Sequence, residues 1–210
     1  MSAMRKVFVC FVALMAFLFQ SGWNGACAQE NAAYVSLPEI IPHLQFMGIP
    51  IEGSPAAYVE SLRMKGFKYA EKKGPVHILT GTFAGVPGCA VGVTSKESFV
   101  WKVSVSFPTQ PSWSAVKARY DKFKESYANK YQVKPESTEI LSPRFKAGTG
   151  QEQWGFEDES SQWQSVFLVP DGFIVLAIKY NRTQSNLFLV VDYVDKINFL
   201  MKEQIDLEDI

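Results

Sequence analysis

The chain has few of the residues that usually carry catalysis or hold a metal. Its 210 residues include three cysteines and two histidines. No C-x-x-C, H-x-x-x-H or H-E-x-x-H pattern occurs, which argues against a zinc site. No G-x-S-x-G turn of a serine hydrolase occurs either. We therefore expect no catalytic, cofactor-binding or metal-binding residue and no cofactor.

An excess of basic residues is also missing. The chain has 21 Lys and Arg against 21 Asp and Glu. Proteins that bind nucleic acid neutralise phosphates with clustered cations, so we do not expect nucleic acid as a partner.

Long apolar runs are confined to the N-terminus. Residues 7–19 form an apolar run of 13 residues, which follows Arg5 and Lys6 and precedes Ala26-Cys27-Ala28. The run is shorter than the roughly 20 residues that span a bilayer, and its flanks predict a secretory signal peptide over residues 1–28. An alternative is a lipoprotein anchored through Cys27, although Asn24 stands where such signals usually carry an aliphatic residue. We expect an exported protein, periplasmic or extracellular, with no transmembrane segment in the mature chain.

The mature chain would keep 182 of the 210 residues, enough for one domain with a real core. Cys89 would be its single cysteine, so no internal disulfide can form, and we expect a buried, inert thiol. Residues 29–42 look like a leader arm interrupted by Pro38 and Pro42. A single α+β domain is expected over residues 43–210.

The hydrophobic pattern predicts helices and short strands in alternating groups. Ser54 and Pro55 begin a helix that ends near Gly66, and Ser112 caps a longer helix closed by Pro135. Asp195 starts the last helix. The expected strands cover residues 76–83, 89–94, 99–107, 151–156, 163–169, 173–180 and 187–194, and residues 133–150 form a long loop. The fold class is α+β, an antiparallel sheet packed against helices in a loose tandem of helix-plus-three-or-four-strand units.

The stretch GIPIEGSP resembles part of a phosphate-binding loop but lacks its chemistry. A phosphate loop needs a lysine after its second glycine, and Ser54 stands there. Pro50 removes a backbone N–H donor, and Glu52 places a negative charge where phosphate would bind. This stretch therefore predicts a helix start.

Trp154 and Trp163 are the candidate binding residues. They flank the acidic turn 157–159, in strands that we expect to be neighbours. Two aromatic rings on one surface could bind a sugar or anchor a partner protein. The alternative is a cross-strand pair in the core.

Three segments carry a resemblance to a known family. FMGIPIEGSPAAYVESLRMKGF, GTFAGVPGCAVGV and the Trp113 region after FP resemble a family of exported proteins from gut bacteria, which share G-I-P-I-x-G, K-G-F and F-A-G-x-x-x-C-x-V-G-V motifs. The resemblance covers residues 44–131 and implies no known activity. The strand-rich order is also similar to that of small envelope and inhibitor modules such as β-lactamase inhibitory protein, at the level of fold.

These observations favour an exported, non-enzymatic binding module of the cell envelope, whose ligand is a protein. A glycan-binding protein that uses Trp154 and Trp163 is the first alternative. A hydrolase with dispersed carboxylates is the second, because such carboxylates can lie far apart in a chain.

Overall fold

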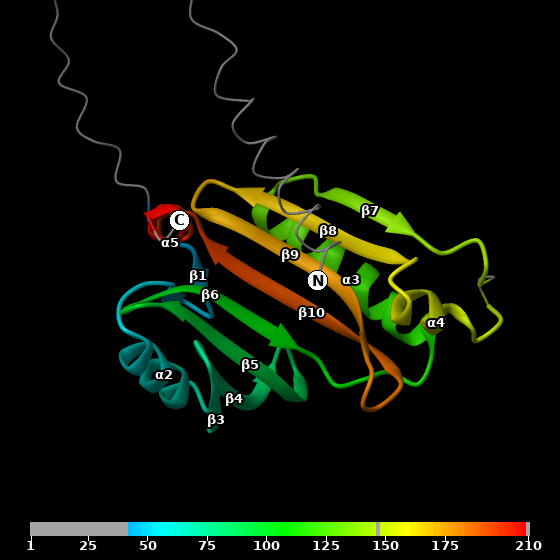
Figure 1. Ribbon diagram of the computed structural model, residues 1–210, viewed down its shortest axis with the longest axis horizontal. Coiled ribbons are helices and arrows are strands. Elements are labelled where there is room, and N and C mark those ends of the chain that lie inside the picture. Colours follow the sequence, from blue (N-terminus) through cyan, green and yellow to red (C-terminus); the bar gives the residue numbers. More distant parts are fainter. Residues whose placement is uncertain (1–41, 146–147, 209–210) are drawn as a thin grey trace, which may run out of the picture. The chain divides into compact units, whose positions relative to one another are not determined.

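An eight-stranded antiparallel sheet forms the body of the structure (Figure 1). The computed structural model describes residues 42–145 and 148–208, so the predicted signal peptide and all of the leader arm except Pro42 lie outside the described residues. The strands are β3 (Lys68–Lys73), β4 (Val76–Phe83), β5 (Val86–Lys96), β6 (Phe99–Ser106), β7 (Glu136–Ile140), β8 (Gln162–Val169), β9 (Gly172–Asn181) and β10 (Asn186–Asp195). Their order across the sheet is β3-β4-β5-β6-β10-β9-β8-β7. The expected α+β class is confirmed.

The sheet consists of two halves with the same order of elements. α2 (Pro55–Met64) precedes β3 to β6, and α3 (Trp113–Tyr131) precedes β7 to β10. Each half runs from an outer edge strand inward. The last strands of the halves, β6 and β10, pair at the centre, where Val105 lies opposite Val191. The repeating unit therefore has one helix and four strands in both halves, with the short helix α4 (Glu152–Glu157) inserted in the second.

α2 and α3 cover the same face of the sheet. α2 contacts β3, β5 and β6, whereas α3 contacts β8, β9 and β10. Both helices begin as predicted, because the Ser54 side chain accepts a hydrogen bond from the Ala57 N–H and the Ser112 side chain accepts one from the Ala115 N–H. Figure 1 views the sheet from the opposite face, so α3 lies behind the strands. We call the side of α2 and α3 the helical face.

The opposite face carries α5 (Lys196–Glu208) at one end. Phe199 packs edge-on against Phe173 of β9, with ring centroids 5.5 Å apart, and lies 6.1 Å from Trp101 of β6. Asp195 caps this helix as predicted, because its Oδ1 accepts a hydrogen bond of 2.8 Å from the Asn198 N–H. Its Oδ2 accepts a second hydrogen bond of 2.8 Å from the Leu44 N–H. This buried carboxylate therefore fixes both the last helix and the start of the described chain.

A two-residue turn joins β1 (Gln45–Phe46) to β2 (Ile49–Pro50) ahead of α2. Met47 and Gly48 form the turn with φ angles of 53° and 77°. Positive φ at both central residues is the geometry of a type I′ hairpin turn. The GIPIEGSP stretch therefore holds a hairpin strand and the cap of α2.

One strand was not predicted, and two expectations about secondary structure were wrong. Residues 68–73, assigned to no element, form the edge strand β3, and residues 136–140, expected to be part of a loop, form the edge strand β7. Residues 151–156 were expected to be a strand, but α4 occupies them. Trp154 therefore lies on a helix and not in a strand next to Trp163.

Candidate functional site

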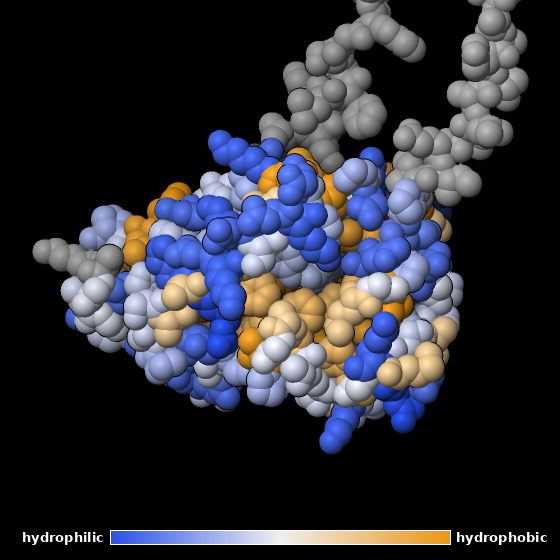
Figure 2. Space-filling model, turned by 180° about the vertical axis from the view of Figure 1, so that it is seen from behind, coloured by the Kyte–Doolittle hydropathy of each residue, from blue (hydrophilic) through white to orange (hydrophobic). Residues whose placement is uncertain are grey.

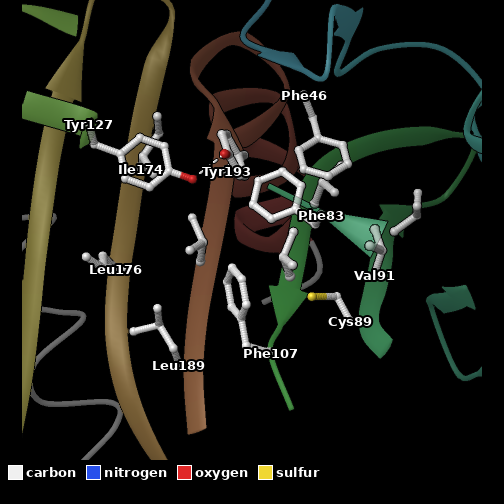
Figure 3. Close-up of a cluster of buried hydrophobic side chains, with 14 of the residues drawn as sticks. Phe46, Phe83, Cys89, Val91, Phe107, Tyr127, Ile174, Leu176, Leu189 and Tyr193 are labelled. Atoms are coloured by element: carbon white, nitrogen blue, oxygen red, sulfur yellow. Dashed lines mark hydrogen bonds between the residues drawn. The ribbon is translucent and has the colours of Figure 1, made fainter. Parts of the chain in front are cut away.

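Six aromatic side chains form a closed circuit on the helical face. The ring centroids are separated by 5.4 Å (Phe46–Phe83), 5.9 Å (Phe83–Phe107), 4.9 Å (Phe107–Phe123), 6.1 Å (Phe123–Tyr127), 6.1 Å (Tyr127–Tyr193) and 5.1 Å (Tyr193–Phe46). Figure 3 shows five of these residues at the centre of the core. Each such contact contributes about 0.5–1.5 kcal/mol beyond area burial, so the circuit, which we call the aromatic floor, stabilises this part of the core.

Local structure explains why these rings meet. Phe123 and Tyr127 are four residues apart on α3, so they lie on neighbouring turns of the helix. Phe83 ends β4, Phe107 directly follows β6, and Tyr193 lies on β10. Five separate elements therefore contribute to one floor, and no short sequence motif contains it.

A groove lies over part of this floor, between α3 and two hairpin turns. It has a volume of about 220 Å³ and is lined by Gln45, Met47, Phe83, Ala84, Phe123, Ser126, Tyr127, Lys130 and Tyr193. We call this site the aromatic groove. Figure 2 views the molecule from this side and shows an apolar area near the centre, bounded by hydrophilic side chains.

Two turns of unfavourable backbone conformation form one rim of the groove. Met47 has φ 53° and Ala84 has φ 49°, and each is followed by a glycine with positive φ. Type I′ turns favour Asn-Gly or Asp-Gly, because asparagine and aspartate tolerate the left-handed conformation. Here the position is occupied by methionine, whose side chain is 39% exposed. A large apolar side chain is thus held at the groove by a backbone conformation that costs about 1–2 kcal/mol.

Two tyrosine hydroxyl groups meet in the floor of the groove. The Oη atoms of Tyr127 and Tyr193 are 2.5 Å apart, and either hydroxyl can be the donor. Burial raises the pKa of both tyrosines above 10.0, and the neighbouring Tyr127 raises that of Tyr193 further. Both hydroxyls are therefore neutral near pH 7, and the groove lining contains no acid, histidine or cysteine.

The structure separates the two tryptophans that the sequence singled out. Trp154 is 45% exposed on α4 and packs edge-on against Phe145, with ring centroids 6.0 Å apart. Trp163 is half-buried on β8 and packs edge-on against Trp113 of α3 at 5.1 Å. Neither lines the aromatic groove. Their expected placement in neighbouring strands was wrong, because residues 151–156 form a helix.

The single described cysteine and the two histidines lie outside the lining of the aromatic groove. Cys89 is buried as predicted, and burial raises the pKa of its thiol. His77 lies on β4, where desolvation, followed by the charge of Lys72, lowers its pKa. His43 lies 3.1 Å from the Asp195 carboxylate. In residues 42–145 and 148–208, no group of three or more His, Cys, Asp or Glu side chains could hold a metal ion.

Comparison with protein-family models, with curated proteins and with solved structures found no match. The resemblance to exported proteins of gut bacteria, and the likeness to small inhibitor modules, therefore stay predictions. Within the described ranges, no helix combines the length and apolar character needed to cross a membrane. The function is therefore best inferred from the aromatic groove.

Proposed function

We propose that this chain is an exported, non-enzymatic binding module of the cell envelope, and that it holds a partner protein in the aromatic groove. The observation that carries the proposal is the exposed Met47 side chain, held in a left-handed conformation at the rim of an aromatic floor. Backbone strain of this kind gathers at functional sites, where the surrounding structure maintains it.

The size of the groove favours a protein over a small-molecule ligand. Pockets for drug-sized ligands have volumes of about 300–1,000 Å³, and the groove has about 220 Å³. A water molecule occupies about 30 Å³ of liquid, so the groove holds about seven waters, roughly the bulk of one large side chain. Protein interfaces concentrate their binding energy in such anchor side chains, which fill pockets at the centre of the contact.

The neutral tyrosine pair favours binding over catalysis. Hydroxyl groups whose pKa is raised by burial stay protonated near pH 7 and supply no base there, and no carboxylate or imidazole lines the groove to activate them. One of the two hydroxyls donates the hydrogen bond between Tyr127 and Tyr193, so one O–H is left to donate to a partner, which suits recognition of a backbone carbonyl at a protein interface.

Glycan binding remains a second candidate because of one observation. Trp154 is 45% exposed, and its ring lies beside Phe145. Under this alternative, Trp154→Ala leaves the fold intact and abolishes the change in tryptophan fluorescence that a sugar produces. An unchanged sugar response in that variant contradicts a role for Trp154.

Site-specific photocrosslinking tests the proposed function. We would place the photoreactive amino acid p-benzoylphenylalanine at Met47, or at Leu168 on the opposite face as a control. The two side chains are similarly exposed, at 39% and 36%. The proposal predicts one dominant protein adduct from position 47 and none from position 168 in cells that express the full chain. Adducts from position 168 alone, or from neither position, contradict it.

A further inference from the structure

Two cations of α3, Arg119 and Lys130, lie in one row along the helix, and Lys130 lines the aromatic groove. Arg119, Ser126 and Lys130 are separated by seven and four residues, and at about 100° per residue they lie within about 20° of one line along the helix. Phe123 and Tyr127 of the groove lie between Arg119 and Lys130 in the chain. The row is about 16 Å long, because a helix rises about 1.5 Å per residue.

The two cations at the ends of this row have no carboxylate partner among the described residues. The Arg119 guanidinium carbon lies 5.7 Å from the centre of the Phe107 ring, and the Nη1 atom of Arg119 is buried without a hydrogen-bond partner. Lys130 lies 4.8 Å from the centre of the Tyr131 ring. Both positive charges thus lie beside aromatic rings, and no carboxylate of the described residues neutralises them.

Acidic side chains of α3 point away from this row. Asp121 and Glu125 follow Arg119 by two and six residues, which places them about 200° and 240° around the helix. Asp121 pairs with Lys117 at 2.6 Å, and Lys124 pairs with Glu139 of β7 at 2.5 Å. The ion pairs of α3 therefore lie on the side toward β7 and β8. The opposite rim of the groove, formed by Gln45, Met47 and Ala84, is uncharged.

We propose that the aromatic groove recognises an acidic segment of its partner, in which one large apolar anchor residue stands between two carboxylates. This inference rests on the proposed function and specifies the chemistry of the partner. The anchor fills the groove of about 220 Å³, and one carboxylate lies toward Arg119 and the other toward Lys130. An extended chain advances about 3.3 Å per residue, so the 16 Å row corresponds to about five residues. Each acidic residue therefore lies two or three positions from the anchor.

Charge complementarity of this kind makes binding depend on salt. Charges at the rim of an interface act mainly on the rate of association, and salt screens them over about 10 Å at 0.1 M ionic strength. Reversal of the Lys130 charge should weaken binding about tenfold at low salt. Near 1 M salt, where the screening length is about 3 Å, the wild type and Lys130→Glu should bind with nearly equal affinity.

A peptide selection tests this inference on the mature chain. Random dodecapeptides would be selected on the wild-type protein and then measured against Lys130→Glu, Met47→Asp and the control Lys179→Glu, which reverses an exposed charge on β9. Circular dichroism checks that each variant is folded. We expect selected peptides to carry a large apolar residue with Asp or Glu within three positions on both sides. They should lose affinity for Lys130→Glu and Met47→Asp, and keep it for Lys179→Glu.

Two other results separate the failure of this inference from the failure of the proposed function. Peptides that need Met47 but show no enrichment in acids, and bind Lys130→Glu normally, overturn the acidic partner and leave the groove as a binding site. If no selected peptide loses affinity for Met47→Asp, the groove is not the binding site and both proposals fail.

Discussion

The hydrogen bond between Tyr127 and Tyr193 can be tested by removing one hydroxyl at a time and then both. Both side chains are buried and their Oη atoms are 2.5 Å apart. In the Tyr127→Phe variant, the Tyr193 hydroxyl stays buried without this partner. A buried polar group left unsatisfied costs about 1–3 kcal/mol, so each single variant should lose about 1–2 kcal/mol of unfolding free energy. Loss of both hydroxyls replaces a polar pair by apolar atoms of similar shape and should leave the free energy of unfolding nearly unchanged.

Urea unfolding at pH 7 measures these differences. The midpoint should fall in both single variants with an unchanged m value, and the double variant should lie within about 1 kcal/mol of the wild type. Tyr180→Phe is the control, since the partly buried Tyr180 makes no hydrogen bond through its hydroxyl to another described residue. Losses that simply add in the double variant would refute the claim that the two hydroxyls satisfy each other.

The same pair predicts how stability changes with pH. The folded-state pKa of both tyrosines is raised above the ordinary value of 10.0 by burial. A group whose folded pKa is raised contributes stability that is complete below its unfolded pKa and is lost as pH rises through the folded pKa. The wild type should therefore lose stability above pH 10, and the double phenylalanine variant should lose less over the same range. An equal loss in both proteins contradicts this assignment.

Three further predictions concern single side chains. Asp195→Ala should cost about 3 kcal/mol of unfolding free energy, because the N–H groups of Leu44 and Asn198 lose their buried acceptor. The control Asp192→Ala on the same strand should cost less than about 1 kcal/mol, and thermal unfolding of the two variants compares these losses. Met47→Asn should leave the free energy of unfolding within about 1 kcal/mol of the wild type, because relief of about 1–2 kcal/mol of backbone strain offsets the lost burial of a methionine that is 39% exposed. The same variant should weaken partner binding. Urea unfolding measures the first effect and a binding titration the second, and a loss of unfolding free energy above about 2 kcal/mol contradicts this prediction. Cys89 should react with a thiol reagent at pH 8 only as fast as the protein unfolds, because its thiol is buried and has a raised pKa; rapid labelling of the native protein contradicts this.

The elements that the sequence predicted well are those with a buried face. The alternation of β6 and the apolar stripe of α3 follow from contact with the core, and both elements lie where the pattern placed them. β3 and β7 were missed because they form the two edges of the sheet. Every residue of β3 is exposed, and β7 contains no buried residue. Edge strands carry charged and polar residues on both sides, so they lack the alternation that identifies a strand.

The wrong prediction of a strand over residues 151–156, where α4 lies, has a different cause. The segment EQWGFE places Trp154 and Phe156 two residues apart, which reads as the alternation of a strand. Six residues are too few to separate a period of 2 from a period of 3.6. In the structure, α4 buries Phe156 against Trp113 and leaves Trp154 outside.

The aromatic groove could not have been predicted from one sequence. Its floor combines rings from β1, β4, α3, β10 and the residue after β6, and their proximity depends on the pairing of β6 with β10 across the two halves. One local signal was available. Met47-Gly48 and Ala84-Gly85 both occupy two-residue turns in which asparagine or aspartate would normally precede the glycine. The apolar residues at these two positions depart from the usual turn chemistry and mark the two turns that line the groove.

The most direct test of the account is a calorimetric titration of the protein that crosslinks at position 47. The partner would be titrated into the wild type, Phe123→Ala of the groove and Phe188→Ala on the uncovered face of β10. Loss of an anchor contact costs more than about 1 kcal/mol, so we predict at least about fivefold weaker binding to Phe123→Ala and unchanged binding to Phe188→Ala. Weaker binding to Phe188→Ala alone would contradict the account and move the binding site to the opposite face of the sheet.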